Sequence, residues 1–109
     1  MSFDIALCRP GTAIPVEVSL HEEGGTYAIG GTNDAELNVT YNYARYFPWR
    51  DLDGKTGAET ETLLRAACAE LGTTRDPDYW AATPGNAGHA LSVLLGWAEA
   101  HPDGVWRVW

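Results

Sequence analysis

Apolar and polar residues alternate in several short runs of the N-terminal half of the chain. Such alternation is typical of a β-strand, because successive side chains of a strand point to opposite faces. The runs that follow the pattern are residues 3–7, 16–20 and 36–41, and glycine-rich turns on both sides of residues 27–29 indicate one more short strand. Pro10-Gly11 ends the first run. These features together predict four strands here.

From Thr56 onward the apolar positions recur at helical spacing. Thr56 and Glu59 have the spacing of a capping box, and Gly72 suits the position that follows a helix, so a helix is predicted over 57–71. A second main helix is predicted over about 87–100.

Individual residues predict where the remaining elements begin and end. Asn86 is the expected N-cap of the second main helix, and His101-Pro102 is its expected end. Asp76-Pro77 predicts a short helical turn through Trp80. Residues 105–109 alternate again and predict a closing strand.

The order of these elements is strands, then helices, then one last strand. It predicts one α+β domain over residues 1–109, with a mainly antiparallel sheet. The two main helices, about 57–71 and 87–100, are expected on one face of that sheet. The C-terminal strand is expected to pair with an earlier strand.

Charge narrows the classes of partner. The 109 residues include 15 acidic and 7 basic ones, for a net charge of −8. This balance disfavours direct binding to nucleic acid, for which Lys and Arg supply the affinity, and to anionic membrane surfaces. An acidic protein can instead meet a basic protein surface, although the charge also serves plain solubility. The absence of a signal-peptide pattern and of a long apolar run predicts a cytoplasmic protein.

Several short motifs carry a family resemblance. They are Asn38-Val39-Thr40-Tyr41-Asn42-Tyr43, Leu52-Asp53-Gly54-Lys55-Thr56, Asp76-Pro77-Asp78-Tyr79, Pro84-Gly85-Asn86 and His101-Pro102-Asp103. Together, over residues 36–109, they resemble a family of small uncharacterised proteins of phages and actinobacteria with an Asn-x-Thr-(His or Tyr)-Asn motif. The chain departs from that family at 83–88, where an Asn-Gly-Trp-Gly type turn is replaced by Gly85-Asn86-Ala87-Gly88. The resemblance implies the fold and a phage-like origin and brings no activity with it.

The segment 38–50 is the first candidate for a binding surface. Its predicted strand places Asn38, Thr40 and Asn42 on one face, where amide and hydroxyl groups can bind the edge of a ligand. The same groups can equally satisfy local backbone atoms near a strand end. Aromatic residues with interleaved arginines follow the row, and they include Tyr41, Tyr43 and Arg45. Such a set suits a planar ligand or a protein interface, or it fills a core that is short of Leu and Ile.

A second candidate is the start of the last helix, at Asn86 and His89, because free backbone amides at a helix start bind anions. The histidines have no metal-ligand spacing, and no cofactor is expected. Gly54-Lys55-Thr56 mimics the end of a phosphate-binding loop, but Trp49 stands where that loop needs its first glycine. No nucleophile motif is evident, so catalysis is not the expected function.

These features predict a small non-enzymatic binding protein, phage-encoded or phage-derived, that acts by occupancy of a host protein or a small planar ligand. Two alternatives stay open: a small hydrolase or lyase that uses a carboxylate or His89, and an acidic decoy that imitates nucleic acid. Five tryptophans are many for a small domain to bury, so a homodimer is also expected.

Overall fold

A computed structural model describes residues 1–22 and 31–109 of the chain. Its strands are β1 (Ser2–Cys8), β2 (Glu17–Glu22), β3 (Gly31–Asp34), β4 (Glu36–Thr40) and β5 (Val105–Val108). Its α-helices are α1 (Gly57–Leu71) and α2 (Pro84–Ala100), and two 3₁₀ helices, η1 (Tyr41–Tyr46) and η2 (Trp49–Leu52), precede them. The expected strand at 27–29 lies outside the described residues.

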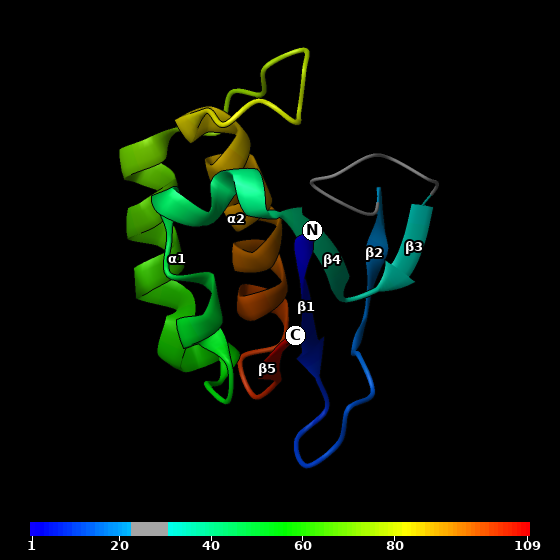
Figure 1. Cartoon of the computed structure of the whole chain (residues 1–109). Helices are drawn as coiled ribbons and strands as arrows, with labels where there is room; N and C mark the ends of the chain where they lie inside the picture. Colours follow the sequence, from blue (N-terminus) through cyan, green and yellow to red (C-terminus); the bar gives the residue numbers. More distant parts are fainter. Residues whose placement is uncertain (23–30) are drawn as a thin grey trace.

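The main sheet has the strand order β4-β1-β5, and both pairings are antiparallel. The C-terminal strand thus pairs with the N-terminal one, as expected, with Trp106 opposite Leu7. Strands β2 and β3 form a separate antiparallel pair. Helices α1 and α2 lie side by side on one side of the main sheet (Figure 1). The fold is therefore α+β, with two main helices on one sheet face, as the sequence predicts.

One apolar core fills the space between the sheet and the helices. Ile5 and Leu7 of β1 pack there with Leu91 and Leu94 of α2, and all four are buried. Trp106 of β5 is buried as well, and its indole N–H donates to the Thr60 hydroxyl of α1 at 2.7 Å. The closing strand is thus attached both to the sheet and to the first helix.

Helix α1 begins where the sequence predicts. The Thr56 hydroxyl accepts from the Glu59 N–H at 3.1 Å, and the Glu59 carboxylate accepts from the Thr56 N–H at 3.0 Å. This reciprocal pair is the predicted capping box. Gly72 ends the helix with a positive φ of 74°, a conformation that costs a glycine little because it has no Cβ.

Helix α2 begins earlier than predicted. The Thr83 hydroxyl accepts from the Asn86 N–H at 3.1 Å, and Pro84 occupies the first helical position. Asn86 is therefore not the N-cap but a residue of the first turn. Proline suits that turn because its fixed φ is helical and its missing N–H would have had no helical partner.

The predicted strand over 36–41 is one residue too long. Thr40 ends β4, and its hydroxyl accepts from the Asn42 N–H at 3.2 Å, which starts η1 instead of continuing the strand. Asn38, Thr40 and Asn42 therefore do not form a row on one strand face. The expected helical turn after Asp76 is also wrong. The Asp76 carboxylate accepts from the Asp78 N–H at 2.8 Å, and this local bond forms a turn in place of a helix.

Candidate functional site

The polar side chains of η1 bind a distant piece of backbone. We call residues 76–83 the aromatic loop; it belongs to the connection between α1 and α2 (Figure 1). The Asn42 amide donates to the carbonyl of Trp80 at 2.7 Å, and the Tyr43 hydroxyl donates to the carbonyl of Tyr79. Each bond satisfies a carbonyl that no helix or strand would satisfy.

The end of the aromatic loop is held in the same way. The Tyr46 hydroxyl donates to the Ala82 carbonyl at 2.6 Å. The Arg45 guanidinium donates to the Tyr46 hydroxyl at 2.9 Å and to the Ala82 carbonyl at 3.3 Å, and it lies 5.0 Å from the centre of the Tyr46 ring. Three carbonyls of the aromatic loop, those of Tyr79, Trp80 and Ala82, are thus bound by side chains of one 3₁₀ helix.

Asn86 holds the aromatic loop from the other side. Its amide accepts from the Asp76 N–H at 2.9 Å and donates to the carbonyls of Asp78 at 3.1 Å and Ala81 at 2.9 Å. Its side chain is almost completely buried, so these bonds replace the water that the amide loses. Both donors and the acceptor of this amide are therefore engaged within the chain.

The aromatic loop presents two rings on this fixed backbone. Tyr79 and Trp80 are stacked, with ring centres 6.2 Å apart and planes 19° apart. Trp80 is 44% exposed, whereas Trp49 and Trp106 are buried in the core. A large exposed ring on a backbone with six inward hydrogen bonds from η1 and Asn86 is preorganised for contact with another molecule.

The remaining predicted site residues lie elsewhere. Asn38 of β4 donates to the Ser2 hydroxyl at 2.6 Å and to the Asp4 carboxylate at 2.8 Å, on β1. Thr40 is buried as the cap of η1. Tyr41 packs edge-on against Phe3, with ring centres 4.6 Å apart.

His89 lies half-buried on α2, one turn beyond Asn86, and its carbonyl accepts from the Ser92 hydroxyl at 2.6 Å. The structure thus brings Asn42, Tyr43, Arg45 and Asn86 together around the aromatic loop, and it leaves Asn38, Tyr41 and His89 outside that contact. Sequence reasoning missed Tyr79 and Trp80 as site residues. The sequence signal for them is a pair of large aromatic residues next to turn-forming aspartates, in a segment with no predicted apolar face that would bury the two rings.

Burial shifts the pKa of three ionisable side chains, Tyr43, Cys8 and Cys68. Burial raises the pKa of the Tyr43 hydroxyl to about 12, so this group stays neutral and donates its proton to the Tyr79 carbonyl at physiological pH. Burial also raises the pKa of the Cys8 and Cys68 thiols, which keeps both in their less nucleophilic form. Within residues 1–22 and 31–109, no group of three metal-binding side chains is found.

No helix in the described part of the chain has the length and apolar character for a bilayer crossing. No protein-family model, curated protein or solved structure matches this chain. The geometry of the aromatic loop and its supports therefore carries the functional conclusion.

Proposed function

We propose that this chain is a small non-enzymatic binding protein that acts in the cytoplasm by occupancy. Its contact surface is the aromatic loop, 76–83, with the exposed edge of η1 around Asn42 and Arg45. The resemblance of segment 36–109 to small proteins of phages and actinobacteria supports a phage-encoded or phage-derived chain, and hence a host protein as the partner.

The observation that carries the proposal is the exposed Trp80 ring on an immobilised loop. An exposed tryptophan ring leaves apolar surface in water, and six hydrogen bonds donated by side chains of η1 and by Asn86 fix the backbone that carries this ring. Tryptophan, tyrosine and arginine are the residues that most often dominate a protein interface. Here Trp80, Tyr79 and Arg45 lie in or against one loop.

The stacking of Tyr79 on Trp80 favours a protein partner over a planar ligand. A planar ligand is best held between two rings, but these two rings already contact each other. The net charge of −8 further favours a partner with a basic surface, because opposite charge speeds the encounter.

The test compares Trp80→Ala with Trp109→Ala. The two rings are 44% and 54% exposed, so each variant removes a similar apolar surface and leaves the core intact. Tagged protein is purified from host cells, and co-purified proteins are quantified by mass spectrometry. One partner is expected in stoichiometric amount with the parent and with Trp109→Ala. Trp80→Ala should reduce it at least about ten-fold, as loss of an interface hot spot does. Equal retention by both variants would exclude the aromatic loop as the contact surface.

Asn42→Ala and Arg45→Ala test the supports of the loop. Each removes a hydrogen bond to a loop carbonyl and leaves both rings in place. Because both side chains are exposed, the melting temperature should fall by no more than about 5 °C. Partner binding should weaken, since the loop becomes less ordered before contact. Unfolding of both variants would show a purely structural role for this segment.

The two alternatives predict different results. A hydrolase or lyase that uses His89 or a carboxylate predicts turnover that one substitution abolishes and that Trp80→Ala leaves unchanged. An acidic decoy predicts binding that weakens steeply with salt and is insensitive to Trp80, because exposed charges are screened.

We also propose that the chain forms a homodimer through the open face of the main sheet. Trp109 is 54% exposed there, and its backbone N–H and carbonyl pair with Asp4. A hollow of about 450 Å³ beside it is lined by Asp4, Ala6, Glu36, Asn38 and Trp109, among others. A second copy would cover this ring and fill the hollow.

A further inference from the structure

The three buried tryptophans differ in whether the indole N–H has an acceptor within the chain. The Trp49 indole N–H donates to the Tyr43 carbonyl at 3.0 Å, and the Trp106 indole N–H donates to the Thr60 hydroxyl at 2.7 Å. Trp97 is also buried, with 6% of its surface exposed, but its indole N–H has no acceptor among the residues that the structure describes. Buried donors are nearly always paired, so an unpaired donor on a buried side chain is one that water or a ligand can reach.

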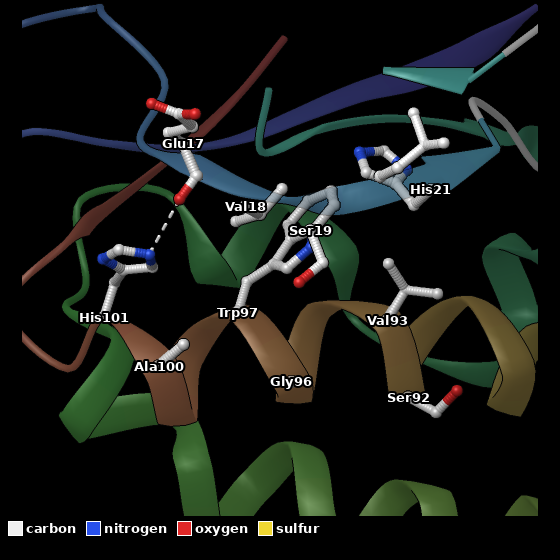
Figure 2. A pocket seen from close by; sticks show the side chains of 11 residues that line it. Glu17, Val18, Ser19, His21, Ser92, Val93, Gly96, Trp97, Ala100 and His101 are labelled. Carbon is white, nitrogen blue, oxygen red and sulfur yellow. Dashed lines mark hydrogen bonds between the residues drawn. The ribbon is translucent and has the colours of Figure 1, made fainter. Parts of the chain in front are cut away.

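The Trp97 N–H is open to a groove. No fully enclosed nitrogen or oxygen of the described side chains lacks a partner, so an unpaired indole N–H has to be reachable from outside. Trp97 lines a groove of about 800 Å³ between β2 and α2, in which Ser19 and His21 lie on one side and Val93 and Gly96 on the other (Figure 2). A space of this size suits a small molecule.

Gly96 differs from the other two glycines of α2 in the space around it. A Cβ at Gly88 would lie 1.7 Å from the Gly72 carbonyl oxygen, and one at Gly85 would lie 2.0 Å from that of Thr74, so packing requires both glycines. A Cβ at Gly96 would meet nothing within 4 Å. A glycine inside a helix costs about 1 kcal/mol relative to alanine. Packing does not require a glycine at Gly96, which lines the open groove.

The polar groups around the groove define the ligand's chemistry. Trp97 offers a donor. The Nε2 atoms of His21 and His101 each contact a carbonyl oxygen, of Asp34 at 2.7 Å and of Glu17 at 3.0 Å. A carbonyl oxygen only accepts, so both Nε2 atoms carry the proton and donate it within the chain. The His21 ring also lies edge-on to the Trp97 ring, with centres 4.9 Å apart, and holds it in place.

We propose that this groove binds a small neutral molecule in which a carbonyl oxygen is attached to an apolar ring. The carbonyl accepts from the Trp97 indole N–H. The ring lies over Gly96 and contacts Val18 and Val93, which line the groove on opposite sides (Figure 2). No residue of the aromatic loop lines the groove, so the small-molecule site and the proposed partner surface can be tested independently of each other.

The test follows the indole N–H signals of the full chain by ¹H–¹⁵N NMR during titration with benzamide, which has a ring and a carbonyl. Benzamide should shift the Trp97 signal selectively and saturably, with a dissociation constant on the order of 1 mM, as suits a molecule of this size. Acetamide has the acceptor without the ring, and toluene has the ring without the acceptor. Both should shift the Trp97 signal much less. A shift by acetamide as large and saturable as that by benzamide would overturn the proposal, as would no saturable shift at all, which would mean that water alone meets the N–H.

Two variants localise the binding. Gly96→Leu adds a side chain to the wall of the groove at a position where a Cβ meets nothing within 4 Å, and leucine has a higher helix propensity than glycine. The variant should therefore fold and bind benzamide at least about ten-fold more weakly. Trp97→Phe keeps an aromatic ring and removes the donor. It identifies the Trp97 signal, and it should weaken benzamide binding about five-fold when followed on backbone signals of β2. Unchanged benzamide binding by Gly96→Leu would overturn the proposal even if Trp97→Phe failed to fold.

Discussion

Asn86 and Tyr43 show how a single polar side chain can order a segment that has no regular structure. Both side chains are buried, and each donates a hydrogen bond to the aromatic loop, Tyr43 to the Tyr79 carbonyl and Asn86 to the Asp78 carbonyl. These carbonyls lie outside helices and strands. A buried polar group without a partner is costly, so loop and side chain stabilise each other only when both are in place.

Tyr43→Phe should therefore destabilise the protein by about 1 kcal/mol, because it removes the donor to the Tyr79 carbonyl. Denaturant midpoints measure the change. Tyr46→Phe is the matched control, since its hydroxyl donates to the Ala82 carbonyl from a half-exposed position and water can replace it. Tyr46→Phe should therefore cost less. A Tyr43→Phe midpoint equal to that of the parent would contradict this role.

The same hydroxyl gives a pH dependence with a definite sign. Burial raises the pKa of Tyr43 to about 12 in the folded chain, above the value of about 10 in an unfolded one. Its contribution to stability is thus complete below about pH 10 and is lost as the pH rises through about 12. Phenolate absorbance should show a tyrosine that ionises near pH 12, and Tyr43→Phe should remove that step.

At the scale of the element, hydrogen bonds between Thr56 and Glu59 determine where α1 begins. Thr56→Ala removes the hydroxyl that accepts from the Glu59 N–H, and this should cost about 1 kcal/mol in the free energy of unfolding. Denaturant unfolding checks it. Thr83→Ala makes the corresponding change at α2 and should cost a similar amount, whereas a start after Asn86 would make it silent. Coincident midpoints for Thr56→Ala and the parent would show that the cap contributes nothing.

At the scale of the whole molecule, the two exposed tryptophans lie on different surfaces. Trp80 is in the connection between the helices, and Trp109 follows the closing strand. Light scattering of the parent should give the mass of a dimer, Trp109→Ala should give a monomer, and Trp80→Ala should remain a dimer. A monomeric parent at high concentration would exclude the dimer. A dimer that survives Trp109→Ala would place its interface elsewhere.

Local patterns predicted the elements well where the deciding interactions are local. The helix 57–71, its capping box and the closing strand depend on periodicity and on residues within a few positions of each other. The predictions were wrong where two local signals competed. Thr40 could continue a strand or cap a helix, and Asn86 could cap a helix or bind the backbone of the loop before it. The 3₁₀ helices and β3 carry signals too short to be distinguished from loops.

By itself, then, the sequence determined the fold class, the start of α1 and the acidic charge, because neighbouring residues or composition set each of these. Only the tertiary structure decided which polar groups meet. Asn42 and Tyr43 bond to residues 36 to 38 positions away in the chain, and the Trp97 N–H is left open to a groove between β2 and α2. The physical reason is that a hydrogen-bonding side chain carries the same atoms whatever it faces, and only packing across the core selects its partner.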